Sequence, residues 1–327
     1  YDGTTQVWVT GVHPGEPFPV TRVKGGVQGF QISADGKTIY YLREGEEAAG
    51  DWKDLRKKFP DLEYGDGKVN YTELWALDLE TWREKKLVAP ERVIREFKVS
   101  PDQTRAAMIT TPDDRLITNE GQSRVDICDL ATGEMTYPPD RIYRADAPSP
   151  FGWLEFLAWS HDSNRLAWTI SFDGYPTEII VADLAGETPD VWELERPNEV
   201  HVTGNLEWVP GQKGLTFLAE DRGAQRIYYV DDVREQTYDG EGTFTPGDFV
   251  VHAFDFSRNG EKLAFVKSDT QHGRDLFVAA ADVKGVWSQL TDINPQIDTW
   301  KLPSIQRVQW KAPDGQEVEG MLELPPD

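Results

Sequence analysis

Residue types that can perform nucleophilic catalysis occur in this chain, but their spacing does not assemble a catalytic site. A serine or cysteine nucleophile needs a base and an orienting acid within reach. The five histidines, at positions 13, 161, 201, 252 and 272, are scattered and lack metal-ligand spacing such as His-x3-His. The string from Gly121 to Val125 lacks the second glycine of the Gly-x-Ser-x-Gly motif and precedes a predicted strand. We therefore expect no catalytic residue in this chain.

Metal and cofactor chemistry is also disfavoured by the residue pattern. The segment 61–67 partly matches a calcium loop, but Asp66 stands where the motif has glycine and Thr72 stands where it has glutamate. The single cysteine, Cys128, falls at an inward position of an alternating strand, which predicts a buried apolar side chain. We expect no metal and no cofactor, and we interpret segment 61–67 as a turn-rich loop.

Composition narrows the classes of partner. The chain of 327 residues has 57 acidic and 34 basic side chains, giving a formal charge of -23 that disfavours nucleic acid and anionic lipid. No stretch approaches the roughly 20 apolar residues that span a bilayer. Its 12 tryptophans, 11 tyrosines and 14 phenylalanines can build a large core. We predict a folded, soluble protein whose compartment, cytoplasm or periplasm, stays open.

A repeated phrase defines the architecture. An apolar run, a turn of the type Ser-x-Asp/Asn-Gly and a second apolar run recur at 30–41, 97–109, 158–168, 207–217 and 255–265. The turn positions 33, 100, 160, 209 and 257 are separated by 67, 60, 49 and 48 residues, the spacing of propeller blades. Asp, Asn and Gly favour tight turns and the flanking alternation buries one face, so each phrase predicts a β-hairpin.

A second strand pair follows each hairpin and completes a four-stranded antiparallel blade. These outer pairs begin at 74–79, 125–130, 179–184, 227–233 and 276–279. One more outer pair, 7–10 with 18–21, has no inner hairpin before it, so we count about 5.5 blades. The absence of alternating amphipathic helices favours an all-β propeller over a parallel α/β fold.

The hairpin of the Ser-Pro-Asp-Gly-Lys type, with Leu-Trp and Gln-Leu-Thr outer strands, resembles the propellers of the prolyl oligopeptidase family and of TolB-type proteins. The tail from Val308 to Asp327 resembles the strand pair by which the peptidase family enters its α/β-hydrolase domain. This resemblance implies a seven-bladed propeller at 1–303, incomplete at its N-terminus, and a strand pair at 304–327 leading into an absent hydrolase domain. It also implies a non-catalytic, substrate-selecting propeller of a serine peptidase of the acylaminoacyl- or dipeptidyl-peptidase kind.

Two irregular segments are candidates for gating the substrate. The insertion 43–73 contains Trp52, Leu55 and Phe59 at the spacing of a short amphipathic helix, and it also carries the pair Glu46 and Glu47. Dipeptidyl peptidases of the family hold the free amine of the substrate with two glutamates on a propeller insertion. The resemblance therefore makes Glu46 and Glu47 candidates for binding a substrate amine. The alternative is a decorative helix and a solvated acidic turn.

The second irregular segment, 144–153, brings Phe151 and Trp153 close to a predicted blade connection. These two aromatics either line the substrate cavity or only join two blades. The expected partners are the hydrolase domain of the same protein and peptide substrates, and a homo-oligomer is compatible with the sequence. Two rival functions remain, a TolB-like interaction propeller without enzymatic activity and a carbohydrate-active propeller using acidic residues at the mouth of its funnel.

Overall fold

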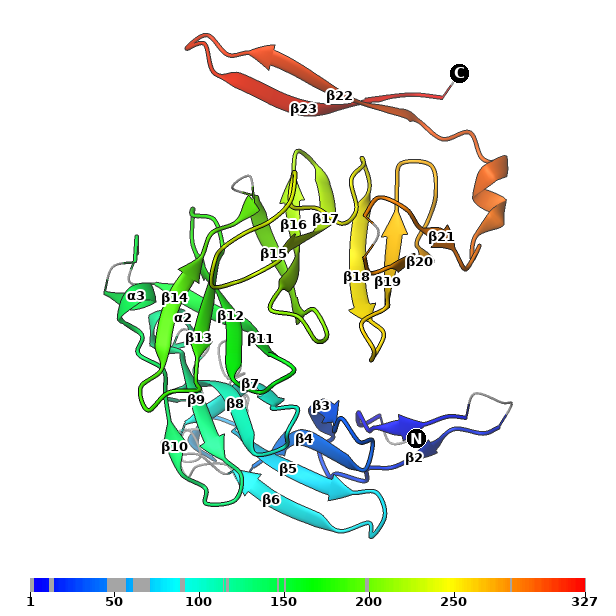
Figure 1. The fold of residues 1–327 in the computed structure, drawn as a ribbon. Coiled ribbons are helices and arrows are strands. Elements are labelled where there is room, and N and C mark those ends of the chain that lie inside the picture. Colours follow the sequence, from blue (N-terminus) through cyan, green and yellow to red (C-terminus); the bar gives the residue numbers. More distant parts are fainter. Residues whose placement is uncertain are drawn as a thin grey trace. The chain divides into compact units, whose positions relative to one another are not determined.

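The computed structural model describes residues 3–11, 15–45, 57–60, 71–88, 92–113, 115, 118–145, 147–149, 151–197, 200–282 and 284–326. Antiparallel β-sheets dominate these residues (Figure 1). The named helical elements are short: α2 (Asn119–Gln122), α3 (Arg141–Arg144) and the 3-10 helix η3 (Pro295–Thr299). The prediction of an all-β chain is confirmed.

Three four-stranded sheets coincide with predicted blades. They are β3 (Val27–Ile32), β4 (Thr38–Glu44), β5 (Thr72–Asp78) and β6 (Glu84–Val88); β7 (Val93–Val99), β8 (Arg105–Thr111), β9 (Arg124–Asp129) and β10 (Met135–Thr136); and β11 (Gly152–Trp159), β12 (Arg165–Phe172), β13 (Glu178–Asp183) and β14 (Asp190–Leu194). In each sheet the strands follow one another in sequence order. A further two-stranded sheet, β1 (Trp8–Val9) with β2 (Phe18–Pro19), matches the outer pair that was predicted without an inner hairpin.

The remaining two blades form one sheet of seven strands. Its members are β15 (His201–Trp208), β16 (Leu215–Asp221), β17 (Ala224–Val230), β18 (Val250–Phe256), β19 (Lys262–Ser268), β20 (Asp275–Ala280) and β21 (Ser288–Gln289). A single parallel pair, Gln225 with Val250, joins β17 to β18. The C-terminal hairpin consists of β22 (Ser304–Lys311) and β23 (Glu317–Leu324).

The fourth blade departs from the predicted pattern. Its outer pair is reduced to β17 and an isolated bridge between Tyr228 and Thr243. The chain turns away after Val230 because the Asp232 carboxylate accepts the backbone N–H groups of Arg234 and Glu235, at 2.9 and 3.3 Å. A carboxylate that satisfies backbone donors in this way stabilises a turn at the expense of a strand.

The recurring turns have one hydrogen-bond design. The Ser33 hydroxyl donates to Asp35 at 2.6 Å and accepts the backbone N–H of Thr38 at 2.9 Å. The same pattern recurs at the turns that begin at Ser100, Ser160 and Ser257. The hydrogen bond from Ser33, together with the backbone N–H of Lys37, lowers the pKa of Asp35. These recurrent acids therefore have a folding role, as their repetition predicted.

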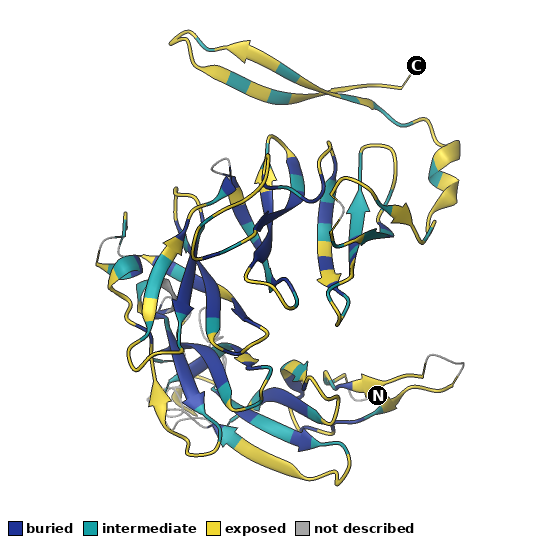
Figure 2. Ribbon diagram, in the orientation of Figure 1, coloured by how far each residue is buried: buried dark blue, intermediate teal, exposed yellow. Residues whose placement is uncertain are grey.

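Buried residues lie along the strands of the sheets (Figure 2), and apolar clusters pack between neighbouring blades. One cluster joins β1–β2 to the blade β3–β6, a second joins that blade to β7–β10, a third joins β7–β10 to β11–β14, and a fourth packs β16–β17 against β18–β20. Cys128 belongs to the second cluster with 2% of its surface exposed, and burial raises the pKa of its thiol. The prediction of a buried, apolar Cys128 is confirmed.

Polar side chains also connect the inner strands of neighbouring blades. The Gln31 amide bonds to both the N–H and the carbonyl of Val99, at 2.8 and 3.0 Å. The Glu96 carboxylate accepts the N–H groups of Phe156 and Leu157, at 2.9 and 2.8 Å, where β11 bulges. Such bonds fix the register between blades that share no strand ladder.

The chain divides into two compact units, Tyr1–Tyr175 with Ile180–Trp192 and Pro176–Ile179 with Glu193–Asp327. The expected division at residue 303 stays a prediction. None of the helices in the described ranges is long and apolar enough to cross a membrane.

Candidate functional site

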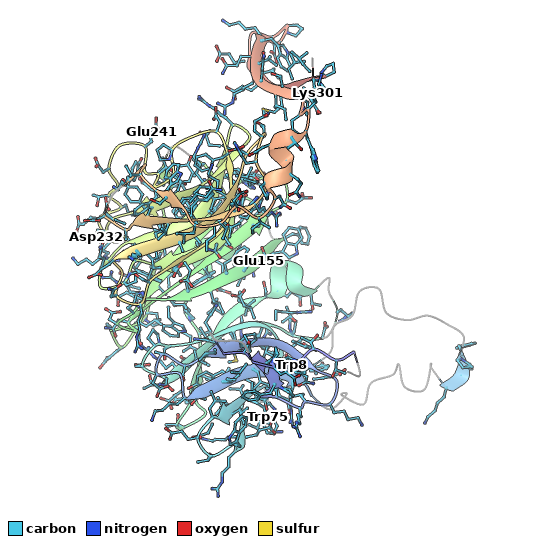
Figure 3. All side chains as sticks on the ribbon, turned by 90° about the vertical axis from the view of Figure 1, so that its right-hand side faces the viewer. Trp8, Trp75, Glu155, Asp232, Glu241 and Lys301 are labelled. Atoms are coloured by element: carbon cyan, nitrogen blue, oxygen red, sulfur yellow. The ribbon has the colours of Figure 1, made fainter. Side chains whose placement is uncertain are left out.

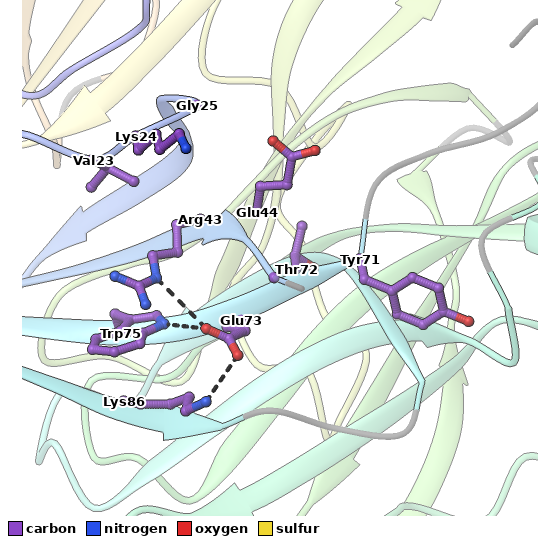
Figure 4. A pocket seen from close by; sticks show the side chains of 11 residues that line it. Val23, Lys24, Gly25, Arg43, Glu44, Tyr71, Thr72, Glu73, Trp75 and Lys86 are labelled. Atoms are coloured by element: carbon purple, nitrogen blue, oxygen red, sulfur yellow. Dashed lines mark hydrogen bonds and ion pairs between the residues drawn. The ribbon is translucent and has the colours of Figure 1, made fainter. Parts of the chain in front are cut away.

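The candidate site is a cleft at one end of the blade β3–β6, where the segment 45–71 joins β4 to β5 (Figure 4). It encloses about 930 Å³. Its described lining consists of Val23, Lys24, Gly25, Arg43, Glu44, Gly45, Tyr71, Thr72, Glu73, Trp75 and Lys86. The lining comes from one compact unit, namely from the segment after β2 and from strands β4, β5 and β6.

Strand register brings the polar residues of the cleft together. Arg43 on β4 lies opposite Glu73 on β5, and Trp75 on β5 lies opposite Lys86 on β6. Glu73 and Trp75 are two residues apart, so both project from the same face of the sheet. Arg43, Glu73, Trp75 and Lys86, from three strands, therefore share one patch. Figure 3 labels Trp75, which lies in the same compact unit as Trp8.

The Glu73 carboxylate is the centre of this patch. It accepts hydrogen bonds from Lys86 Nζ at 2.9 Å and from Trp75 Nε1 at 2.9 Å, and Arg43 Nε lies 3.6 Å away. Desolvation alone would raise the pKa of Glu73, but the bonds from Lys86 and Trp75 and the charges of Lys86 and Arg43 outweigh it and lower the pKa. Glu73 is therefore ionised at neutral pH and is a poor general acid.

The Arg43 side chain is held in place by its neighbours, but some of its N–H donors have no hydrogen-bond partner in the described chain. Its guanidinium lies over the Trp75 ring, 3.4 Å from the ring centroid, and 30% of the side chain is exposed. Its Nε faces Glu73, and its two Nη groups donate no hydrogen bond within the part of the chain that the structure describes. In the same described part, Lys24 and Glu44 also line the cleft without a hydrogen-bonded or ionic partner.

The charges of the cleft do not balance. Lys24, Arg43 and Lys86 face two carboxylates, Glu44 and Glu73, so the described lining has a surplus positive charge in a chain of charge -23. The lining holds fixed donors and an aromatic surface but no nucleophile beside a base. This arrangement suits binding of an anionic or polar ligand better than covalent catalysis.

The structure brings none of the described residues that were singled out from the sequence into the cleft. Glu46, Glu47 and Trp52 lie outside the described residues, as do Leu55 and segment 61–67. Phe151 is 55% exposed before β11, and Trp153 is partly buried on β11 opposite Ser171. Neither aromatic lines the cleft. Their gating roles stay predictions.

Sequence reasoning missed Arg43, Glu73, Trp75 and Lys86. The alternation of Glu73 and Trp75 along one strand was the available signal, because it places a charge and an aromatic on one face. No short sequence pattern predicts that Arg43 and Lys86 lie beside them, because this depends on the register of β4 with β5 and of β5 with β6.

One histidine contacts a hydroxyl, but its surroundings differ from those of a catalytic base. His252 Nε2 lies 2.7 Å from Ser268 Oγ. Burial lowers the pKa of His252, and the nearby charge that also lowers it is Arg274, a cation where a triad places a carboxylate. The described ranges also contain no group of three or more side chains that could hold a metal ion.

The C-terminal hairpin has two different faces. The cross-strand partners Val308 and Gly320, Trp310 and Val318, Gln306 and Leu322, and Ser304 and Leu324 form a mainly apolar face. The other face carries Ile305, Arg307, Gln309, Lys311, Glu317, Glu319, Met321 and Glu323 and is mainly charged. The Trp310 ring lies against Gly320, where an added Cβ would come within 3.0 Å of the indole.

The charged face of the hairpin contacts loops of its own unit. Arg307 Nη2 lies 2.7 Å from Asp248 Oδ1, and Arg222 Nε lies 3.8 Å from Glu319 Oε1. On the apolar face Trp310 is 51% exposed, and Leu322 and Leu324 are each 41% exposed. The described chain therefore leaves the apolar face of this hairpin largely uncovered.

Solved structures with similar folds include two peptidases and one TolB. A puromycin-hydrolysing peptidase of Mycobacterium tuberculosis is 16% identical, with a TM-score of 0.57 over 94% of this chain and 45% of that chain. Prolyl oligopeptidase B from Galerina marginata is 8% identical, with a TM-score of 0.57 over 90% and 38%. A putative TolB from Agrobacterium tumefaciens is 16% identical, with a TM-score of 0.53 over 95% and 94%.

No protein-family profile matches the chain, and no curated protein matches it. The chain spans less than half the length of the two peptidases and nearly the whole length of the TolB. At such low identity these likenesses show the fold alone. Together with the successive four-stranded antiparallel sheets, they show that the chain is a β-propeller similar to those of peptidases and TolB.

Proposed function

We propose that this chain is the non-catalytic propeller of a serine peptidase, and that it selects oligopeptide substrates for an α/β-hydrolase domain of the same protein. The observation that carries the proposal is the C-terminal hairpin. It follows the last blade, its charged face contacts Asp248 and Arg222, and no described residue covers most of its apolar face.

The uncovered face has a clear energetic consequence. Burying apolar surface contributes about 25 cal/mol per Å², so Trp310, Leu322 and Leu324 favour a covering partner. A two-stranded hairpin is only marginally stable by itself and gains stability when a sheet or a domain packs on it. The similar peptidases are more than twice as long as the region they share with this chain, which supports a further domain as that partner.

A second candidate is an interaction propeller of the TolB kind. The observation that favours it is the likeness to a putative TolB over 94% of that protein. In this case the apolar face of the hairpin would take a separate protein, and no peptide would be cleaved.

The deciding experiment uses the full-length protein that contains this chain. We expect a fluorophosphonate probe to label one serine outside residues 1–327, and we expect cleavage of short peptides but not of folded proteins. Absence of labelling together with absence of peptide cleavage would reject the peptidase function and leave the TolB-like function.

The role of the hairpin is tested in the same protein by two matched substitutions. Leu322→Asp places a charge on the apolar face, whereas Met321→Asp places the same charge on the other face, beside Gly223 and near Arg222. We expect Leu322→Asp to lower peptidase activity at least about tenfold and to expose the domain junction to limited proteolysis. Met321→Asp should keep wild-type behaviour, and equal effects of the two variants would contradict the proposed docking.

A further inference from the structure

The cleft at the end of the blade β3–β6 contains a cation, Arg43, whose orientation is fixed and whose Nη groups have no hydrogen-bond acceptor among the described residues. The two Nη groups of Arg43 provide four N–H donors, and none of them has an acceptor in the described chain. A planar guanidinium with unused donors matches the two oxygens of a carboxylate and binds them in a bidentate manner.

The orientation of Arg43 is fixed before a ligand arrives. Trp75 supports the guanidinium at 3.4 Å from the ring centroid, and Glu73 attracts Nε from 3.6 Å. A side chain that is already ordered loses less conformational entropy on binding, so more of the interaction energy appears as affinity.

The neighbouring charges favour a singly charged anion. Lys86 and Trp75 both bond to Glu73, which reduces its repulsion toward an incoming carboxylate. Lys24 adds a second positive group to the lining. Glu44 lines the same cleft, so three cations and two carboxylates leave the described lining with a net charge of one, which a single carboxylate neutralises.

We propose that this cleft binds a carboxylate group of a peptide, with the Nη groups of Arg43 as the recognising donors and Lys24 as a supporting charge. The proposal rests on the proposed function, because it names the peptide carboxylate as the substrate group that the propeller recognises. Its chemistry allows two sources of the carboxylate, an Asp or Glu side chain and a peptide C-terminus.

The test is isothermal titration calorimetry on the 327-residue chain with four probes. The first is an acetylated and amidated hexapeptide with one central Glu, and the second has Gln in its place. The third is the Gln peptide with a free C-terminus, and the fourth is inorganic phosphate. We expect at least one of the two carboxylate peptides to bind about tenfold or more tightly than the amidated Gln peptide, and the tighter of the two identifies the source.

Variants assign the binding to Arg43. Arg43→Gln should weaken carboxylate binding about 10- to 100-fold, the range of a lost charge-assisted hydrogen bond. Lys37→Gln is the matched control, because it removes the same charge at the opposite end of β4, where Lys37 pairs with exposed Glu80. This control should bind like the wild type.

Glu44→Gln tests the same site with an effect of opposite sign. Removing this carboxylate should tighten binding of the acidic peptide and reduce the discrimination against phosphate. Unchanged binding in Arg43→Gln, an equal loss in Lys37→Gln, or phosphate binding as tight as peptide binding in the wild type would each overturn the assignment.

The calorimetry does not depend on a hydrolase domain. If the full-length protein cleaves no peptide but the chain still prefers carboxylates through Arg43, the proposed peptidase function fails and the binding site stands. If the protein is a peptidase and Arg43→Gln binds acidic peptides normally, the site fails and the function stands.

Discussion

Two neighbouring blades each place an arginine at the corresponding end of their sheets, and they use it in opposite ways. In the blade β3–β6, Arg43 on the second strand lies opposite Glu73 on the third. In the blade β7–β10, the corresponding pair is Thr110 opposite Arg124. The second of these ends is closed by ion pairs, whereas the first is an open cleft.

The difference follows from one further position on the third strand. Two residues after Glu73 comes Trp75, which supports Arg43 without consuming its Nη donors. Two residues after Arg124 comes Asp126, which is 1% exposed and accepts the Thr110 hydroxyl at 2.6 Å.

Asp126 also lies among two cations of its own blade. Its Oδ1 lies 2.7 Å from Arg124 Nε, a contact with ion-pair distance but without hydrogen-bond geometry, and its Oδ2 lies 3.8 Å from Arg92 Nε. A guanidinium becomes a recognition group only where its neighbours orient it and leave its donors unpaired. An aromatic at the third-strand position does this, and a buried carboxylate does not.

The largest expected effect comes from removing that buried carboxylate. Asp126→Ala leaves Arg124, Arg92 and the Thr110 hydroxyl without their common acceptor, and we expect it to lower the free energy of unfolding by about 3 kcal/mol. Urea unfolding followed by circular dichroism measures the loss. Glu80→Ala is the control, because Glu80 and its partner Lys37 are 65% and 58% exposed, and it should cost no more than about 1 kcal/mol. Equal losses would remove the contrast between buried and exposed pairs.

The next contrast compares Arg92, which supports the blade β7–β10, with Arg43 of the blade β3–β6. Arg92 donates to the Thr110 hydroxyl at 2.8 Å, to the Thr110 carbonyl at 3.3 Å and to the Gln122 carbonyl at 2.9 Å. We expect Arg92→Gln to cost about 1–2 kcal/mol, because these acceptors lose their donors. Arg43→Gln should cost less, about 0.5 kcal/mol, because its Nη groups donate no hydrogen bond in the described chain and its Nε lies 3.6 Å from Glu73. Urea unfolding measures both costs. A larger cost at Arg43 than at Arg92 would contradict a structural role for Arg92 and a ligand-binding role for Arg43.

The propeller fold was predictable because its signals are local. Ser33 and Asp35 form their turn within five residues of sequence. Because that turn recurs along the chain, the number of repeats predicts the number of inner hairpins. The cleft was not predictable in the same way. Arg43, Glu73 and Lys86 come from three strands, and only the register of the finished sheet makes them neighbours.

The fourth blade shows a second limit of sequence reasoning. The segment 227–233 was predicted to start an outer strand pair, but the strand ends at Val230 because Asp232 and its two backbone donors turn the chain. A side chain that competes for backbone hydrogen bonds overrides an apolar pattern. The link from Glu96 to the bulge at Phe156 was equally hidden, because it spans 60 residues and depends on packing between blades.

A smaller effect tests the ionised state of the cleft. The pKa of Glu73 is lowered in the folded chain, so its ion pairs stabilise the fold above the ordinary carboxyl value of 4.5, and this contribution is lost as pH falls through the lowered value. We expect Glu73→Gln to cost about 1 kcal/mol at pH 7. The difference between wild type and variant should vanish in acid. Unfolding curves between pH 7 and pH 2 measure it, and a difference that grows on acidification would contradict the assigned sign.

The smallest contrast lies at the opposite end of the same two blades, in the turns that join their outer strands. Asp78 and Asp129 accept the same backbone donors, but the turn places Trp82 at φ 56° in one blade and Gly133 at φ 76° in the other. Gly133→Ala should cost about 1 kcal/mol, because nothing lies within 4 Å of the added Cβ and only backbone strain opposes it.

Trp82→Gly should change the free energy of unfolding by less than about 0.5 kcal/mol, because relief of the left-handed conformation offsets the backbone entropy that glycine adds. The Trp82 side chain is 55% exposed and lines a second cleft of about 580 Å³ with Phe18 and Pro19, so little packing is lost. Thermal unfolding of both variants side by side measures the asymmetry. A loss above about 1 kcal/mol in Trp82→Gly would show that the indole packs on β2 strongly enough to hold the outer pair β1–β2 in place, and the strained turn would then have a structural cause.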